Sequence, residues 1–192
     1  MGTQPVTRLT EEEYLRIERA AEYKSEFIGC EMFAMPAGTS RHAMLGANTI
    51  AELRFQLRGK RCRVMNSEMR VRTPDSGTQL YPDASVACGP VQMHAGASDL
   101  MVNPVLLIEV LSPSTASYDR GVKFELYREL PSFRSYLIVH QTSIFIEHFS
   151  KNSDGSWILR EYRGKDARIP LPEIECELHL GSVYEDVMDE PV

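Results

Sequence analysis

The sequence lacks the features that would place a protein in or across a membrane. No apolar run approaches the ~20 residues that a transmembrane helix needs. The N-terminus, MGTQPVTRLTEEEYL, has neither the apolar core of a secretory signal nor the Ser/Thr pattern of myristoylation. We therefore expect a cytoplasmic protein with no membrane partner.

The short motifs of several enzyme classes are also missing. There is no Walker A loop, no G-x-G-x-x-G, no G-x-S-x-G and no H-E-x-x-H. The four cysteines, Cys30, Cys62, Cys88 and Cys176, are widely scattered and form no C-x-x-C pair. We therefore expect free thiols rather than a zinc site.

Positive charge is in deficit, because the net charge is −6. This balance argues against a protein that coats nucleic acid non-specifically. It is compatible with a local basic groove, since a metal ion can neutralise an acidic site. The basic side chains that could form a phosphate-facing surface, or else a plain solvated face, are Arg41, Arg54, Arg58, Lys60, Arg61, Arg63, Arg70 and Arg72.

The sequence does contain the pattern of one α/β domain spanning residues 1–192. Its 43% hydrophobic and 25% charged residues are ordinary for a globular protein of this length. Apolar periodicity and capping signals predict helices over 10–22, 40–58 and 114–130. Alternating or short apolar stretches predict strands within 26–35, 61–65, 68–73, 81–88, 105–111, 135–140, 143–149 and 157–164, with a loop over 89–103 and one more short strand in the tail. This order predicts a mixed central β-sheet flanked by α-helices.

Glu109 interrupts the apolar strand in NPVLLIEVLSPST, residues 103–115. Leaving a lone carboxylate charged in a buried strand costs several kcal/mol or more. Asp83 lies in YPDASV, near the start of another predicted strand. If the two strands are neighbours, the carboxylates lie a few ångströms apart, because paired strands are separated by about 4.8 Å.

Two carboxylates in a poorly solvated place repel each other, so one of them takes up a proton or a cation lies between them. Ligation by few carboxylates suits Mg²⁺, which keeps several waters and relies on substrate phosphates. The alternative is structural: Asp83 caps a turn, and Glu109 pairs with an Arg or Lys from a helix. The pattern alone leaves both interpretations open.

The helix predicted after Glu109 could bring a lysine back to the carboxylates. Asp119, Lys123 and Tyr127 are spaced i, i+4, i+8 and share one face. A lysine there would bind the scissile phosphate or stabilise developing charge; an ordinary salt bridge between Lys123 and Asp119 is the alternative. Glu26 opens an apolar strand and could line the same site, or it is a solvated strand end. For His42, in the first turn of a helix, we expect a solvated or capping role rather than a ligand.

Several segments together resemble the Uma-type family of restriction endonuclease-like proteins, in the PD-(D/E)XK nuclease superfamily. The specific segments are YPDASV and NPVLLIEVLSPSTASYDRGVKFELYRELPSFRSYLIV. The likeness extends upstream to EYLRIERAAEYKSEFIGCEMFAM and SRHAML, and downstream through DGSWILREY. It covers nearly the whole chain and implies a restriction endonuclease-like fold with a metal-dependent phosphodiesterase site.

The resemblance also implies roles for individual residues. Asp83 matches the motif aspartate and Glu109 the second acidic residue, so both would be metal ligands. The motif lysine, two positions after the glutamate, is replaced here by Leu111. Lys123 matches a lysine that the family supplies from the following helix, and Glu26 matches an upstream acidic position that often lines the site.

Three further positions bear on the resemblance. His42 matches a recurrent family histidine whose role does not follow from the sequence. Cys30 stands where the family usually has a glycine, and Glu68 where an aspartate is common. Neither departure affects the implied metal ligands, although Glu68 could still belong to the site.

The leading hypothesis is a Mg²⁺-dependent endodeoxyribonuclease acting on DNA, with Mn²⁺ as a substitute metal. Asp83 and Glu109 would hold the metal, while Lys123 and Glu26 would complete the catalytic set. A nuclease that cuts both strands is expected to be a homodimer. The first rival is a nucleic-acid- or protein-binding module that keeps the fold but does not cut, favoured by the pI of about 5.4 and by Leu111. The second is another two-carboxylate hydrolase, such as a glycosidase.

Overall fold

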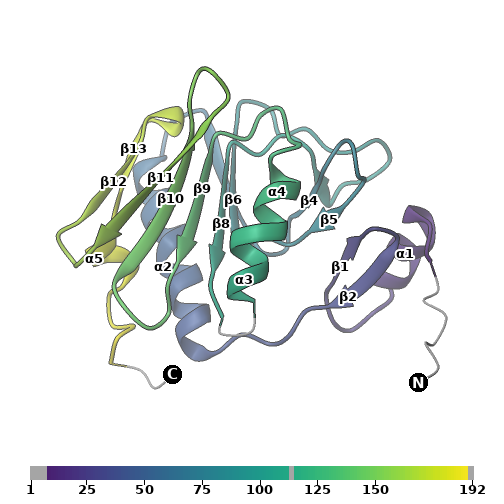
Figure 1. The fold of residues 1–192 in the computed structure, drawn as a ribbon, viewed down its shortest axis with the longest axis horizontal. Helices are drawn as coiled ribbons and strands as arrows, with labels where there is room; N and C mark the ends of the chain where they lie inside the picture. The colour runs from purple at the N-terminus through teal and green to yellow at the C-terminus, as the bar shows by residue number, and fades with distance from the viewer. Residues whose placement is uncertain (1–7, 113–114, 190–192) are drawn as a thin grey trace.

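The structure is a computed structural model that describes residues 8–112 and 115–189. Its centre is a six-stranded sheet in the order β11-β10-β9-β8-β6-β3 (Figure 1). β8 and β9 pair in parallel, while the other neighbours are antiparallel. The strands are β3 (Cys62–Asn66), β6 (Ala84–Cys88), β8 (Leu106–Val110), β9 (Ser135–Val139), β10 (Phe145–Lys151) and β11 (Trp157–Arg163). The predicted mixed central sheet is confirmed.

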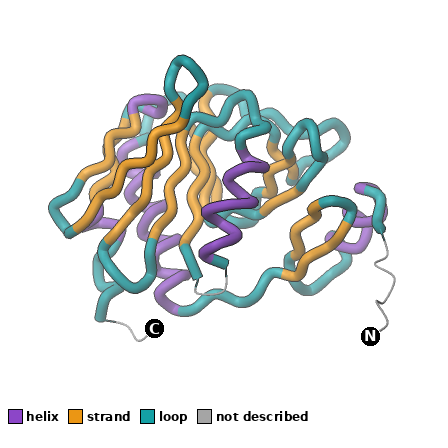
Figure 2. Tube along the Cα trace, in the orientation of Figure 1, coloured by secondary structure: helices purple, strands orange, loops and turns teal. Residues whose placement is uncertain are grey.

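Helices cover both faces of this sheet (Figures 1 and 2). The long helix α2 (Ser40–Gln56) lies on one face, and its Leu45 and Leu53 share an apolar cluster with Ile108 of β8. The other face carries a composite helix of α3 (Ala116–Tyr118), the π-helical η1 (Asp119–Lys123) and α4 (Phe124–Tyr127). Because side chains alternate along a strand, Glu109 points to the same face as Leu107, toward this composite helix.

A second sheet of five strands, in the order β2-β1-β5-β4-β7, lies beside the first. Its strands are β1 (Ser25–Ile28), β2 (Glu31–Ala34), β4 (Arg70–Arg72), β5 (Gln79–Leu80) and β7 (Leu100–Met101). The helix α1 (Glu11–Glu18) precedes it and begins at the predicted capping box. The Thr10 hydroxyl accepts from the backbone N–H of Glu13 at 3.2 Å, and the Glu13 carboxylate accepts from that of Thr10 at 2.7 Å.

The C-terminal part forms two strands where the sequence predicted one. β12 (Arg168–Leu171) pairs antiparallel with β13 (Cys176–His179), and the 3₁₀ turn η2 (Pro172–Ile174) connects them. The short helix α5 (Leu180–Val183) follows and packs on α2. This segment completes the apolar core on the α2 side of the central sheet.

Some predicted boundaries are wrong. The stretch 81–88 is a strand only from Ala84, because Pro82 cannot donate to a ladder and residues 81–83 instead cross from one sheet to the other. Within the stretch 68–73, only Arg70–Arg72 form a strand. The expected loop 89–103 contains the short strand β7. The helix predicted over 114–130 ends at Tyr127 and is interrupted by the π turn. Residue 114, one of its expected caps, lies outside the described residues.

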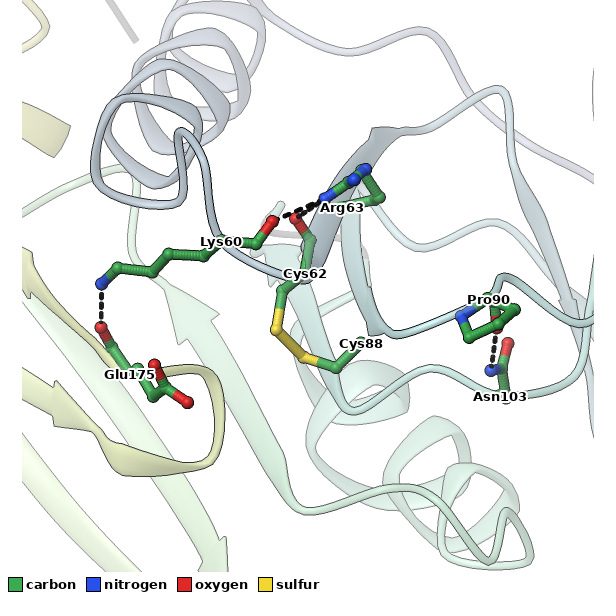
Figure 3. Close-up of a disulfide and its surroundings, with 7 residues drawn as sticks. All are labelled: Lys60, Cys62, Arg63, Cys88, Pro90, Asn103 and Glu175. Atoms are coloured by element: carbon green, nitrogen blue, oxygen red, sulfur yellow. Dashed lines mark hydrogen bonds between the residues drawn. A yellow bond between two sulfur atoms is a disulfide. The ribbon is translucent and has the colours of Figure 1, made fainter.

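The expectation of four free thiols is wrong for two of them. Cys62 and Cys88 are direct partners in the register of β3 and β6, with Cα atoms 4.0 Å apart, and they form a disulfide (Figure 3). Strand register decides this pairing, and the spacing of cysteines along the sequence does not reveal register. Cys30 and Cys176 are free, as expected.

Within residues 8–112 and 115–189, the structure contains no helix long and apolar enough to cross a membrane. This observation agrees with the absence of long apolar runs in the sequence.

Candidate functional site

The two carboxylates singled out in the sequence lie on adjacent strands of the central sheet. β6 and β8 pair antiparallel with Ala84 opposite Ile108, so the next positions along are Asp83 and Glu109. The Asp83 carboxylate accepts a hydrogen bond of 2.7 Å from the backbone N–H of Val110, which fixes it at the start of β6. Asp83 and Glu109 line one cavity of about 220 Å³.

Glu109 is 3% exposed and lies at the buried end of this cavity. Its Oε1 accepts from the Tyr127 hydroxyl at 2.8 Å and from the Lys123 ammonium at 3.1 Å. Burial raises the pKa of Glu109 well above its usual value, and the nearby carboxylates of Asp83 and Asp119 raise it further, against the opposing effect of Lys123. A cation at the site would therefore stabilise the ionised form of Glu109.

Lys123 is the positive centre of the site. Its ammonium lies 3.1 Å from Glu26, 3.1 Å from Glu109 and 3.6 Å from Asp119. Burial alone would lower the pKa of Lys123, but these three carboxylates raise it well above the ordinary lysine value. The sequence therefore placed Lys123 correctly beside Glu109, and the expected pair with Asp119 is present as well.

The π turn η1 directs two charged side chains of one helix into the site. Asp119 and Lys123 begin and end this five-residue segment, and both are buried, at 3% and 4% exposure. π turns are rare, and they frequently occur at functional sites. Leu111 is buried in the apolar cluster that also contains Leu107 and Tyr127, so no cation comes from position 111.

Glu26 reaches the site from the other sheet. One of its oxygens contacts Lys123 and accepts from the backbone N–H of Tyr81 at 3.3 Å, and the other accepts from the Tyr118 hydroxyl at 2.9 Å. Glu26 is 5% exposed, so the alternative of a solvated strand end is wrong. The site consequently lies at the junction of the two large sheets.

His42 lies in the cavity, contrary to the expectation of a solvated or capping role. The capping is done by Thr39, whose hydroxyl accepts from the backbone N–H of His42 at 3.2 Å. The imidazole itself has Nε2 3.3 Å from the Asp83 carboxylate. This interaction raises the pKa of His42 against the opposing effect of burial. The segment joining β2 to α2 sets this placement, and no local sequence signal encodes its path.

Three residues of the site were not assigned to it from the sequence. The sequence indicates Asp119 only as a salt-bridge partner of Lys123, but Asp119 lines the cavity, and burial raises its pKa. Tyr118 and Tyr127 donate hydrogen bonds to Glu26 and Glu109. The spacing of Asp119, Lys123 and Tyr127 was the available signal for two of the three, because it places them on one face.

Other candidates lie elsewhere. Glu68 has a side chain 73% exposed and pairs with Lys24, so it is not part of the site. Arg70 is buried and paired with Asp99. A separate pocket, which Cys62 of the disulfide also lines, is lined by four of the remaining basic residues: Arg54, Arg58, Lys60 and Arg63.

The residues present fit a magnesium ion better than a fully protein-ligated metal. Within the described part of the chain, no group of three or more His, Cys, Asp or Glu side chains is arranged to hold a metal. Mg²⁺ needs only one or two carboxylates when waters and substrate phosphates supply the remaining ligands. Asp83 and Glu109 offer such a pair in one cavity.

A family model described as "Putative restriction endonuclease", Uma2, matches residues 11–181. The chain belongs to the Uma2 family. Two relatives of similar length, the uncharacterized proteins slr1290 and sll1609 of Synechocystis sp., are each 33% identical to it. The first alignment covers 94% of this chain and 93% of the relative, and the second covers 84% and 91%.

A solved structure shares the fold. A DUF820 protein of Anabaena variabilis, described as a putative nuclease, superposes with a TM-score of 0.73 at 17% identity, over 92% of this chain and 97% of that one. At this identity the likeness shows the fold alone. The family resemblance and the α/β fold predicted from the sequence are confirmed.

Proposed function

We propose that this Uma2 protein is a Mg²⁺-dependent endodeoxyribonuclease that hydrolyses phosphodiester bonds in DNA. The observation that carries the proposal is the contact between Lys123 and Glu109 in a cavity that Asp83 also lines. A structural salt bridge would need only one carboxylate. Here an ammonium, several carboxylates and a histidine converge where a phosphate could enter.

Each side chain has a distinct part in the proposed reaction, in which water attacks phosphorus and the bond to the leaving oxygen breaks. Asp83 and Glu109 would hold Mg²⁺, which when bound polarises the scissile phosphate and favours ionisation of the attacking water. The Lys123 ammonium stabilises negative charge that develops on the phosphate. Glu26 orients Lys123, and His42 orients the Asp83 carboxylate.

The test is nicking of supercoiled plasmid with and without Mg²⁺ or Mn²⁺. We expect metal-dependent nicking by the wild type and its loss in Asp83→Ala and Glu109→Gln. Glu68→Gln, which removes an exposed carboxylate outside the site, is the matched control and should cut normally. Metal titration gives an independent result: equal binding by wild type and Glu109→Gln would refute the metal role of Glu109.

The rival function is a binding module that keeps the fold without cutting. It is favoured by the net charge of −6 and by a Lys123 ammonium already engaged by three carboxylates. Nicking that requires added metal and disappears in Asp83→Ala would reject it. A glycosidase is less well supported, because Glu109 is buried and hydrogen-bonded to Lys123 and Tyr127 rather than facing an open sugar-sized cleft.

DNA as the partner and a homodimer as the assembly are part of the same proposal. The described residues of one chain form one such site, and cutting both strands of a duplex calls for two. Light scattering after gel filtration measures the assembly directly. A monomer that nonetheless cuts DNA would reject the dimer while leaving the chemistry intact.

A further inference from the structure

An apolar groove lies directly beside the charged cavity. Its volume is about 420 Å³, and its walls include Ile28, Phe33, Met35, Pro36, Tyr118 and Val122. Lys123 lines both the apolar groove and the charged cavity, and so do Thr115 and Met35. A molecule bound at Lys123 therefore has an apolar surface within immediate reach.

Two side chains in the apolar groove are unusually exposed for their type. Phe33 is 48% exposed and Val122 is 47% exposed, and only three other large hydrophobic residues in the described parts of the chain are exposed. Exposed apolar surface beside buried charge is typical of a ligand groove. Contact with water alone does not favour apolar side chains on the surface next to a buried charge.

The strand register places Phe33 on the same side as the site. Phe33 of β2 is the direct antiparallel partner of Glu26 of β1, so the two side chains point to one face of the hairpin. Glu26 contacts the Lys123 ammonium, and Val122 directly precedes that lysine. The aromatic ring and the ammonium therefore belong to one continuous surface formed by the hairpin and the π turn.

The chemistry of the walls indicates what kind of group would fit. Phe33 supplies an exposed aromatic ring, and the Tyr118 ring has the Lys123 ammonium 5.5 Å from its centroid. Base–aromatic stacking is favourable for every base. The two charged residues at the groove, Glu26 and Lys123, are paired with each other. The apolar groove is thus suited to stacking rather than to reading a base edge, and the phosphate would remain at the ammonium.

We propose that the apolar groove holds a nucleobase next to the scissile phosphate, so that the preferred substrate is single-stranded or locally unpaired DNA. This inference rests on the proposed nuclease function. A base inside a duplex must first leave the stack, which costs a few kcal/mol, whereas a base in a single strand is already accessible.

The experiment measures binding and cutting separately. Binding to the wild-type protein, with Ca²⁺ in place of Mg²⁺ as a cation that also takes oxygen ligands, is followed by fluorescence anisotropy with three DNAs: a single strand, the same strand with one abasic position, and the duplex. Cutting of the same DNAs is measured with the wild type. Phe33→Ser and Val122→Ser alter the groove, and Phe55→Ser is the matched control, since Phe55 is 71% exposed on α2 and lines neither the groove nor the cavity.

We expect the single strand to bind more tightly than the duplex and to be cut faster. Phe33→Ser should weaken single-strand binding about ten-fold, the size of one lost base–aromatic stack. In the protein whose groove is unaltered, an abasic position next to the cut should weaken binding by a similar factor. In Phe33→Ser, the same abasic position should have little further effect on binding. Phe55→Ser should bind like its parent.

The contrary outcomes are distinct. Equal cutting of duplex and single strand, with no effect of Phe33→Ser, overturns the groove and leaves the nuclease function standing. Single-strand binding that depends on Phe33 without metal-dependent cutting supports the groove and overturns the nuclease. A protein that neither binds nor cuts any of the three DNAs overturns both.

Discussion

At the scale of single residues, Lys123 is the group on which its neighbours depend most. Three carboxylates lie within 3.6 Å of its ammonium, and the lysine is 4% exposed. Removing one partner of a buried ion pair is costly because the remaining charges stay buried without compensation. The site therefore contributes to the stability of the protein as well as to its proposed chemistry.

Lys123→Met is expected to destabilise the protein by about 3–5 kcal/mol at pH 8. The pKa values of Glu109 and Asp119 are raised above 4.5 and 3.8, so these groups bind more protons in the folded than in the unfolded state. The stability of the variant should consequently fall as pH rises above about 4.5, and the loss should be smaller at pH 5. Urea unfolding at both pH values measures it.

The control is Lys24→Met, which removes a partly exposed pair with Glu68 and a hydrogen bond of 2.9 Å to the Ser67 carbonyl. A surface pair of this kind is worth about 0–1 kcal/mol. A Lys123→Met protein as stable as Lys24→Met would show that the carboxylates do not need the ammonium.

Cys30 is a residue in a conformation that favours glycine. It occupies the second position of the two-residue turn between β1 and β2, with φ 70°. Cys30→Gly should stabilise the protein by about 1 kcal/mol, which raises Tm by roughly 2–4 °C in a chain of this size. Gly29→Ala should destabilise the protein, because Gly29 has φ 59°, a backbone conformation that is unfavourable for alanine. An added Cβ would meet no other atom there, so the effect would come from the backbone alone. Calorimetry of the two variants tests both predictions, and equal Tm values for the two variants would contradict them.

At the scale of elements, the disulfide joins the edge strand β3 to β6. The Cys62–Cys88 bridge closes a segment with a sequence separation of 26. It constrains the unfolded chain, which by the loop-entropy account stabilises the fold by about 2–4 kcal/mol. Because β6 leads directly from Asp83, the bridge anchors the strand that carries one end of the site.

We therefore expect dithiothreitol to lower the midpoint of urea unfolding of the wild type. The doubly substituted Cys62→Ser, Cys88→Ser protein should already be destabilised and should not respond to the reductant. Titration of the free thiols of the unfolded, unreduced protein gives a second measurement, with two reactive thiols expected. Four reactive thiols under non-reducing, denaturing conditions would contradict the bridge.

The elements show which parts of the structure are encoded locally. Glu109 was identifiable because a carboxylate in a short apolar strand is anomalous, and Lys123 because helical spacing put it on a face with Asp119. Both signals depend on residues close in sequence. The sequence leaves open whether the strands of Asp83 and Glu109 are neighbours, and the pairing of β6 with β8 supplies this.

The parts that were missed depend on contacts between distant segments. His42 reaches Asp83 only because the connection after β2 crosses to α2, and Cys62 meets Cys88 only through strand register. The second sheet was not anticipated because its strands β4, β5 and β7 are two or three residues long. Strands this short carry too few residues for a recognisable alternation.

At the scale of the whole molecule, stability should depend on pH through a histidine that lines neither the charged cavity nor the apolar groove. His148 of β10 is 3% exposed and its Nε2 lies 2.6 Å from the Ser135 hydroxyl. Burial lowers the pKa of His148 to about 4. The unfolded chain therefore binds more protons than the folded one between about pH 4 and 6.5.

It follows that stability should fall as pH decreases through this window, by up to about 3 kcal/mol from this one group. His148→Gln should flatten the difference between pH 6.5 and 4.5, measured by urea unfolding. Comparing variant and wild type cancels the contributions of the raised carboxyl pKa values. An identical pH slope in the two proteins would contradict the assignment.

The site as a whole contains four carboxylates, from Glu26, Asp83, Glu109 and Asp119, around the single ammonium of Lys123. This formal excess of negative charge opposes the approach of an anionic DNA strand. A divalent cation between Asp83 and Glu109 would reverse most of that repulsion, so each ligand would increase the affinity for the other by the same factor. Magnesium and DNA should thus bind with positive, reciprocal cooperativity, and the metal concentration would set how much substrate the protein can hold.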